Sequence, residues 1–339
     1  MPRECDNCRV DSATRTRAGL PGIAVFAPST LATVTIEDGG AQPEIHFHAG
    51  GQGVWVAHMA AELGAEVSLS TVLGGESGRL LSGLLEAEHV TVHAVHGSTA
   101  NGVYVHDRRR GKRVVVAQTA APRLQRHELD ELYGIALTEG LRRGVACLTG
   151  PQRPGVLEPS VYARLSADLR RNGATVVADL TGPPLEAALE GGIDVLKLSE
   201  AELVAGEWAD GTGVAAIVNG LRRLERAGAH VVIASRGPRP AIAVVGGRLL
   251  ELRGPRFTAA ETGGTGDAMV GAIAVSLARG QEVEEALRLG AAAGAINATR
   301  HGLGTGCRGQ VESLARGVTL RPFAAPLPAA NQQAGTAGA

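Results

Sequence analysis

The run from Glu261 to Ala268, with the sequence ETGGTGDA, has the residue types and spacing that phosphoryl transfer requires. Its glycines tolerate positive φ and leave their backbone N–H groups uncovered; they are Gly263, Gly264 and Gly266. The apolar pattern that starts at Met269 predicts a helix directly after them. The run therefore predicts an anion-binding helix N-terminus with one carboxylate, that of Asp267, in its first turn.

Asp267 is the candidate general base. It would accept the proton of a substrate hydroxyl while the N–H groups of Gly264, Thr265 and Gly266 stabilise charge on the transferred phosphoryl group. An Asp in a first helical turn also caps helices in proteins of every function. Whether Asp267 is catalytic or only a cap therefore depends on the rest of the chain.

A second glycine cluster lies far upstream and opens another predicted helix. It spans His48 to Ala57, reads HAGGQGVWVA, and precedes a predicted strand from Glu66 to Leu73. A third segment, Lys197 to Glu202 (KLSEAE), lies between the two glycine clusters. No segment is specific alone, but their order along one chain argues against chance similarity.

Together these segments resemble the ribokinase/PfkB family of small-molecule kinases over residues 22 to 306, and within it the 1-phosphofructokinase and tagatose-6-phosphate kinase branch. The resemblance implies an α/β, ribokinase-like fold: a mostly parallel sheet covered by helices, with a small β-sheet lid over the sugar site. In the family this lid is frequently also a dimer surface, so a homodimer is implied. The resemblance further implies ATP and Mg²⁺ as cofactors, a sugar-like substrate, and Asp267 as the base.

The resemblance also assigns residues to each substrate. Glu202 occupies the position of the family's Asn-x-x-Glu motif, whose Glu organises water around Mg²⁺ on the ATP phosphates, although Ser199 replaces the Asn. ATP binding is implied at Ser235, Gly237, Gly263 and Asn297, and beside the turn from His301 to Gly304. Binding of the sugar is implied at Gly50, Gly51, Gln52, Trp55 and Asn101.

The departures from the family gather at the acceptor end of the site. Leu31 stands where an Asp usually holds sugar hydroxyls, Gln52 replaces a Lys of the phosphosugar branch, and Ala100 replaces a phosphate-binding Arg. Each lost cation removes a contact worth about 1.5–3 kcal/mol. The basic run Arg108 to Lys112 restores this charge only if its turn folds inward. The acceptor therefore stays open: a sugar phosphate, an unphosphorylated compound such as a nucleoside, or a ligand that a weakly catalytic member senses.

Composition agrees with an enzyme of this kind. The chain has 339 residues, 44% of them hydrophobic, and a net charge of -1, which favours neither a nucleic-acid nor a membrane partner. Residues 1–19 lack the apolar segment of a secretion signal, and no apolar run reaches the roughly 18 residues that span a bilayer. We expect a cytoplasmic protein. Its four cysteines are too scattered for a disulfide framework, and Cys5 and Cys8 lack the second half of a zinc site.

The alternation of predicted strands and helices favours one kinase domain at residues 21–320 with a mostly parallel sheet. Polar tails at 1–20 and 321–339 are expected to be disordered. Alternating polarity predicts antiparallel lid strands at about 28–48 and 91–118, the latter including a strand from Thr91 to His96.

Two other functions are less well supported. Histidines close in sequence suggest a metal site on the lid, but no Cys or carboxylate completes a recognisable ligand set; they are His46, His48, His89, His93 and His96. A dinucleotide-binding enzyme would carry an acidic residue at the end of its second strand, and none stands at the expected distance after Gly50.

Overall fold

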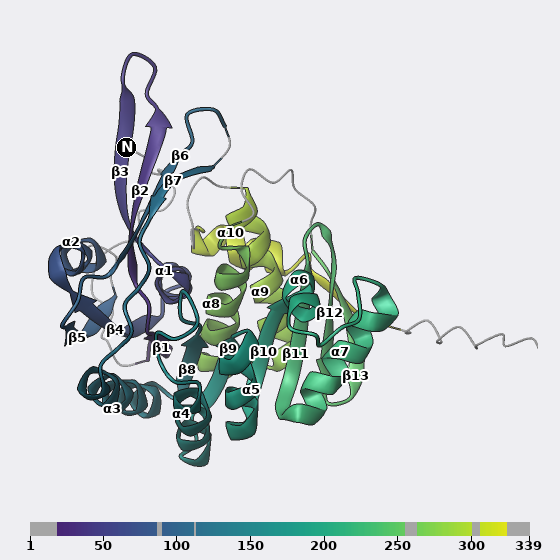
Figure 1. The fold of residues 1–339 in the computed structure, drawn as a ribbon. Coiled ribbons are helices and arrows are strands. Elements are labelled where there is room, and N and C mark those ends of the chain that lie inside the picture. The colour runs from purple at the N-terminus through teal and green to yellow at the C-terminus, as the bar shows by residue number, and fades with distance from the viewer. Residues whose placement is uncertain (1–18, 87–89, 112, 255–262, 300–305, 324–339) are drawn as a thin grey trace, which may run out of the picture.

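The computed structural model describes residues 19–86, 90–111, 113–254, 263–299 and 306–323. They form a ten-stranded sheet with helices on both faces and a separate four-stranded sheet that projects from one end (Figure 1). Among the helices in these ranges, none is long and apolar enough to cross a membrane. The expected tails at 1–18 and 324–339 lie outside the described residues.

The large sheet has the strand order β14-β13-β12-β11-β10-β9-β8-β1-β4-β5. From β5 to β11 neighbouring strands are parallel, whereas β11 to β14 pair antiparallel. This confirms the expected mostly parallel α/β architecture. The strands are β1 Gly22–Ala27, β4 Glu66–Gly74, β5 Thr91–Gly97, β8 Val145–Thr149, β9 Thr175–Asp179, β10 Ile193–Ser199, β11 Ala229–Arg236, β12 Arg239–Val245, β13 Arg248–Arg253 and β14 Thr319–Pro322.

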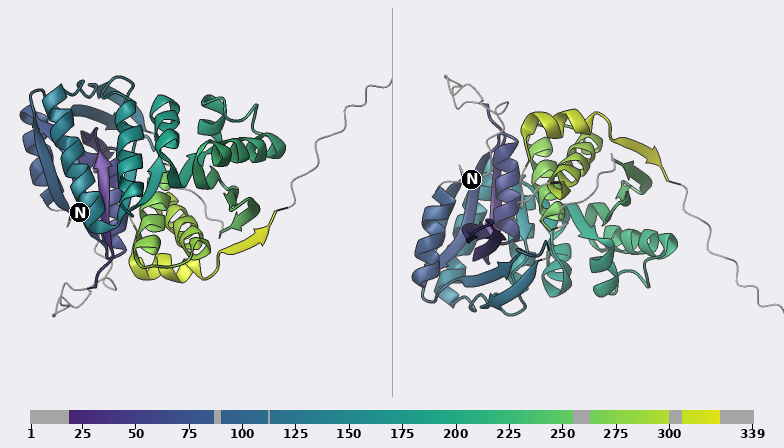
Figure 2. Two further views of the ribbon diagram at one scale, coloured as in Figure 1. Left: turned by 90° about the horizontal axis from the view of Figure 1, so that it is seen from below. Right: turned by 90° about the horizontal axis from the view of Figure 1, so that it is seen from above.

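Helices cover both faces of this sheet, because successive side chains of a strand point to opposite faces and both sets are apolar (Figure 2). In β1, Val25 belongs to the core shared with α1, α8 and α9, while Phe26 belongs to the core shared with α3, α4, α5 and α7. The helices are α1 Gln52–Glu62, α2 Gly75–Glu86, α3 Arg126–Arg143, α4 Ser160–Arg171, α5 Gly182–Gly191, α6 Glu200–Ala205, α7 Val214–Ala227, α8 Thr265–Ala278, α9 Val283–Ala298 and α10 Arg308–Ala315.

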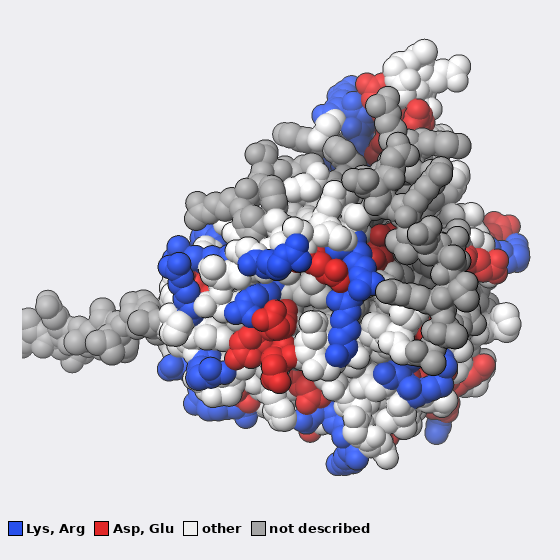
Figure 3. All heavy atoms as spheres, turned by 180° about the vertical axis from the view of Figure 1, so that it is seen from behind, with Lys and Arg blue, Asp and Glu red and all other residues white. Residues whose placement is uncertain are grey.

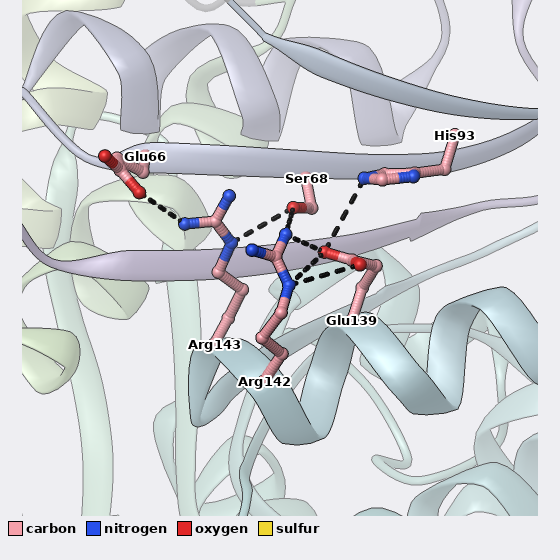
Figure 4. A network of polar contacts seen from close by, with 6 residues as sticks. All are labelled: Glu66, Ser68, His93, Glu139, Arg142 and Arg143. Carbon is pink, nitrogen blue, oxygen red and sulfur yellow. Dashed lines mark hydrogen bonds and ion pairs between the residues drawn. The ribbon is translucent and has the colours of Figure 1, made fainter. Parts of the chain in front are cut away.

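Polar contacts fix α3 to the β4 and β5 edge of the sheet (Figure 4). Arg143 of α3 donates to Glu66 at 2.6 Å and to Ser68 at 3.1 Å, both on β4. Arg142 donates to Glu139 and to the same Ser68, and His93 of β5 lies 3.6 Å from Glu139. Ser68 thus accepts from both arginines. The cluster lies near the start of β4, at the end of the sheet opposite to the glycine loop.

The small sheet consists of β2 Leu31–Asp38, β3 Pro43–Gly50, β6 Gly102–Asp107 and β7 Val114–Gln118, in the order β3-β2-β6-β7. Two expectations for it were wrong. The strand Thr91–Gly97 is not part of it but pairs in parallel with β4, because α2 between them makes a helical crossover. The pair β2 and β6 is likewise parallel rather than antiparallel.

The large sheet also includes residues nearer the C-terminus of the chain than the sequence predicted. Strand β14 reaches Pro322, two residues beyond the expected domain end at 320, with Arg321 opposite Glu251 and Pro322 opposite Leu250 of β13. The N–H of Phe323 then donates to the carbonyl of Leu249 at 2.9 Å. Chain pairing therefore orders residues whose composition alone resembles a tail.

One face of the small sheet is apolar and open. Ile45 and Phe47 of β3 are 57% and 52% exposed and stand opposite Ile36 and Val34 of β2. At the other edge, Val114 of β7 is 57% exposed on the same face, opposite Asp107 of β6, which pairs with Ile36, whereas Val115, opposite His106, points to the other face. Contiguous exposed apolar side chains of this kind mark association surfaces.

We expect this face to be covered by the same face of a second copy. The double variant Ile45→Asp with Phe47→Asp should be a monomer where the parent is a dimer, because dimerisation would bury two charges against apolar strands. Light scattering coupled to size-exclusion chromatography measures the mass. Leu141→Asp, on the exposed surface of α3, is the matched control and should leave the mass unchanged. A parent protein that is monomeric at all concentrations tested would contradict the expectation.

Candidate active site

The site lies where the parallel strands end and α8 begins. Strands β8, β9, β10 and β11 end at Thr149, Asp179, Ser199 and Arg236, and α8 packs against β8, β9 and β10. Ligands of open α/β sheets bind at this edge. The glycine loop and the segment from Lys197 to Glu202 are therefore brought together at one end of the sheet.

The glycine loop takes the form that anion binding requires. Gly264 precedes α8 with φ of 70°, a left-handed conformation that glycine adopts without strain. The hydroxyl of Thr265, the first helical residue, is buried and has no hydrogen-bond partner among the described residues. The loop thus offers N–H groups and one unused hydroxyl at a helix N-terminus. Glu261 and Thr262 lie outside the described residues.

A buried ion pair lies directly beneath this loop. The Nζ of Lys197 donates to the Oδ2 of Asp179 at 3.1 Å, and both residues are less than 5% exposed. A Cβ added to Gly266 would come 2.1 Å from that Nζ. Gly266 is therefore required for space, because the ammonium of Lys197 occupies the volume that any side chain would fill.

Asp267 lies beside this pair in the first turn of α8, and only 8% of it is exposed. Burial raises the pKa of Asp267 to about 8, and the neighbouring charge of Asp179 adds to the rise, while Lys197 opposes it. Burial would lower the pKa of Lys197, but the three carboxylates around it raise that pKa above its usual value. Asp267 thus combines the position and the proton affinity of a general base near neutral pH.

Gln52 links this carboxylate cluster to the second glycine cluster. It is the first residue of α1, and its Oε1 accepts from the N–H of Gly150, just after β8, at 2.8 Å. Burial raises the pKa of both Asp267 and Asp179, and a hydrogen bond from the Gln52 amide to each carboxylate partly opposes that rise. The structure therefore places Gln52 beside these two carboxylates.

Glu202 is the third carboxylate near Lys197, after Asp179 and Asp267. Its Oε2 accepts from the N–H of Ser199 at 2.6 Å, and its own N–H donates to the Ser199 hydroxyl at 3.2 Å, so the two residues form the capping box of α6. Burial alone would raise the pKa of Glu202, but Lys197 and the Ser199 N–H outweigh it and lower that pKa. Ser199 thus orients Glu202 without the amide of the family's Asn.

Two of the residues assigned to ATP lie at the end of β11 and in the turn that leads to β12. Ser235 donates to the carbonyl of Leu198 at 3.4 Å, and Gly237 has φ of 60° at the turn itself. Between them the nearly buried Arg236 donates to Glu200 of α6 at 3.1 Å. This ion pair fastens the turn to the helix that carries Glu202.

Asn297, which was also assigned to ATP, is fully buried in α9, and its Nδ2 donates to the carbonyl of Gly263 at 2.9 Å. Its side chain therefore anchors the glycine loop from within the protein. The neighbouring turn from His301 to Gly304 lies outside the described residues.

The residues assigned to the sugar have divergent roles. Asn101 donates to the carbonyls of Thr30 and Val72 at 3.0 and 2.8 Å and accepts from the N–H of Gly74 at 2.8 Å, so its amide already joins three backbone segments. Trp55 is half-buried on α1. Asn101 is therefore a structural residue, contrary to the expectation that it contacts the acceptor.

Two glycines assigned to the sugar directly precede α1 and pack closely against other parts of the chain. Gly51 has φ of 109°, and a Cβ on it would come 2.7 Å from the carbonyl oxygen of Ser29. A Cβ on Gly50 would come 2.3 Å from the hydroxyl oxygen of Thr33. Both positions need glycine, because the chain of the small sheet passes against them.

Sequence reasoning missed the two most buried charges of the site, Asp179 and Lys197. Each stands at or near the end of an otherwise apolar strand, TVVAD or IDVLKLS. A charged residue at the carboxyl end of a buried parallel strand was the available signal. The histidine alternative receives no support: within the described residues, no group of three or more potential ligands could hold a metal ion.

A sequence model of pfkB family carbohydrate kinases matches residues 28–308 of this chain. ATP-dependent 6-phosphofructokinase isozyme 2 of Escherichia coli K12 is 29% identical over 262 residues, which cover 76% of this chain and 83% of that protein. 1-Phosphofructokinase of Rhodobacter capsulatus is 29% identical over 292 residues, which cover 84% and 86%.

Solved structures agree. Phosphofructokinase-2 from Escherichia coli in complex with potassium has a TM-score of 0.75 at 25% identity, with 88% of this chain and 98% of that chain covered. Ribokinase from Arabidopsis thaliana complexed with ribose and ATP has a TM-score of 0.68 at 19% identity, covering 88% and 99%, a likeness of fold alone. The family match spans well over half of the sequence, and this chain therefore belongs to the PfkB family of carbohydrate kinases.

Proposed function

We propose that this protein transfers the γ-phosphate of ATP to a hydroxyl of a sugar-like acceptor, with Asp267 as the general base, through a single kinase domain that ends at residue 322. The observation that carries the proposal is the position of Asp267: a buried carboxylate with a raised pKa in the first turn of α8, directly after the glycine loop. A helix cap needs neither burial nor proton affinity. The adjacent Lys197 further supports a site built for phosphate chemistry.

In this mechanism the acceptor hydroxyl gives its proton to Asp267 as its oxygen bonds to the γ-phosphorus, and the bond from that phosphorus to the bridging oxygen of ADP breaks. The N–H groups of Gly264, Thr265 and Gly266 hold the oxygens of the transferred group. Lys197, under Gly266, adds positive potential from below the loop. Gln52 keeps the Asp267 carboxylate oriented through the hydrogen bond between them.

The residues around Lys197 fit a magnesium ion that retains its water. Three carboxylates surround one ammonium, namely those of Asp179, Glu202 and Asp267, which leaves the cluster with excess negative charge. Mg²⁺ binds through few protein oxygens, several waters and the substrate phosphates. When bound, it neutralises charge on those phosphates. Half-buried Glu202 has one carboxylate oxygen engaged by Ser199, and we propose that the other orders this water.

We propose an acceptor without a phosphate group. The similar proteins include enzymes named for phosphorylated fructose, but this chain has Gln52 and Ala100 where acceptor-phosphate cations are expected. Within the basic turn, Arg109 is already engaged, because it is bound to Asp107 of the same turn at 2.6 to 3.1 Å. Lys112 lies outside the described residues.

Asp267→Asn should lower turnover by about 10²–10⁴, the usual contribution of a positioned base, while ATP affinity stays near that of the parent. Coupled ADP release measures turnover, and calorimetric titration measures ATP binding. Asp210→Asn, which removes an exposed carboxylate, is the control and should behave as the parent. A folded Asp267→Asn protein with parental turnover would exclude Asp267 from the chemistry.

The pH profile should report the raised pKa of Asp267. Since the ionised carboxylate is the active form, kcat/KM should rise with pH and level off above about 8. Stability should change in the opposite sense. Because the folded-state pKa exceeds the ordinary Asp value of 3.8, the stabilisation is complete below pH 3.8 and is lost as pH rises through about 8. Asp267→Asn should show neither dependence. A flat kcat/KM in the parent from about 2 pH units below this pKa to about 1 unit above it would contradict the assignment.

An acceptor panel tests the charge argument. We expect kcat/KM for fructose-1-phosphate to fall below about 10⁴ M⁻¹s⁻¹ and to be exceeded by an unphosphorylated sugar or nucleoside. Ala100→Arg should improve use of the phosphosugar, because it restores one cation without touching Gln52. Efficient turnover of fructose-1-phosphate by the parent would show that other residues bind the phosphate. No turnover with any acceptor would favour a sensor of the same fold.

A further inference from the structure

A hollow lies on the back of the molecule at the turn between α8 and α9. Its volume is about 470 Å³, within the range of small-molecule sites. We call it the α8–α10 hollow; it is lined by Arg279, Gln281, Glu285, Arg288, Leu289, Glu312, Ala315 and Arg316. Figure 3 shows the side of the molecule on which α9 and α10 lie, where basic and acidic side chains are interspersed.

The basic groups at this hollow outnumber the acids that neutralise them. Glu312 alone serves two arginines, accepting from Arg279 at 3.2 Å and from Arg308 at 2.9 Å. Glu285 pairs with Arg288. Arg316 is exposed and has no ion pair with any described residue. The lining thus has three guanidinium groups and two carboxylates, an excess of one positive charge, and Arg308 beside it draws on one of those carboxylates as well.

The polar groups at the hollow are mainly donors, and two of them are fixed in place. Arg279 is held by the carbonyl of Leu63 at 2.7 Å as well as by Glu312. The hydroxyl of Ser276 donates to the Oε1 of Gln281 at 2.8 Å. The NH₂ group of Gln281 is therefore its remaining hydrogen-bonding function, and it is a donor. Burial and the neighbouring Arg308 lower the pKa of Arg279, so an added negative charge would relieve this repulsion.

The hollow is connected to the glycine loop by two helices. Helix α8 runs from the loop at Thr265 to Ala278 beside the hollow, a length of about 21 Å at 1.5 Å per residue. Helix α9 runs back from Val283 to Ala298 and carries Asn297, which holds the carbonyl of Gly263. Both helices are mostly buried and pack against each other. The hollow therefore lies at the far ends of the two elements that position the loop.

We propose that the α8–α10 hollow is a binding site for a small phosphate-bearing metabolite, distinct from the active site, and that its occupancy changes turnover through α8 and α9. Arginine forks match phosphate oxygens in pairs, and each such charge-assisted contact is strong. The regulatory part rests on the proposed kinase function; the binding part does not.

Binding is tested with inorganic pyrophosphate by calorimetric titration of the full chain. The hollow variant is Arg288→Ala with Arg316→Ala, and neither change should affect folding, since Arg288 is 30% exposed with a surface partner and Arg316 is exposed. Arg171→Ala, on the exposed end of α4, is the control for lost positive charge. Gly264→Val removes phosphate binding at the glycine loop, because a β-branched residue resists the left-handed φ.

We expect the hollow variant to bind pyrophosphate at least about tenfold more weakly than the parent, with Arg171→Ala unchanged and Gly264→Val retaining the hollow's share. Loss in Gly264→Val together with full retention in the hollow variant would assign all binding to the glycine loop and overturn the proposal. Absence of any binding by the parent at about 1 mM would do the same.

The regulatory part is tested by turnover. Pyrophosphate at a concentration that fills the hollow should change kcat of the parent and of Arg171→Ala, but not kcat of the hollow variant, whose basal rate should be normal. Binding without any difference between these responses would refute the coupling. If no acceptor is turned over, the proposed kinase function fails, while the binding result stands independently.

Discussion

One buried ammonium determines the electrostatics of the site. Lys197 lies under the glycine loop with Asp179, Glu202 and Asp267 around it, and it cannot neutralise all three. Burial and the excess negative charge together raise the pKa of Asp267. At the same time the ammonium sits behind Gly266, where its field favours an anion in the loop. Proton affinity below the loop thus arises from burial and from Asp179, against the effect of Lys197, whereas anion affinity above the loop arises from Lys197 and the N–H groups.

The rest of the fold serves to hold α1, α8 and α9 close enough to form this cluster. Glycines allow the approach: a Cβ on Gly53 would come 2.4 Å from that of Ala27, one on Gly271 would come 2.6 Å from the carbonyl oxygen of Val56, and one on Gly290 would come 2.7 Å from the side chain of Ile273. Such contacts leave no room for a larger side chain. The position of Asp267 is therefore fixed by helix packing as well as by its own loop.

Much of this arrangement could be predicted from sequence, and the failures have physical reasons. The glycine loop, α8 and the parallel sheet depend on local patterns, and the prediction of fold was confirmed. Strand β5 was misplaced because alternation does not reveal the pairing partner, although α2 before it implied a parallel crossover. The hydrogen-bond partners of Asn101 and Asn297 could not be predicted, because an amide's partner, backbone or substrate, depends on tertiary contacts.

The three-way bond of Asn101 has a mechanical consequence. It joins Thr30, at the entrance to β2, with Val72 and Gly74 of β4, and it stands one residue before β6 begins. Both parallel strands of the small sheet therefore leave the large sheet from one fixed point. A rotation of the small sheet about Asn101 would therefore move its far end, the turn between β2 and β3, much more than this base. A ligand in contact with the base alone would be little affected by such a rotation, whereas a ligand that reaches the far end would be strongly affected.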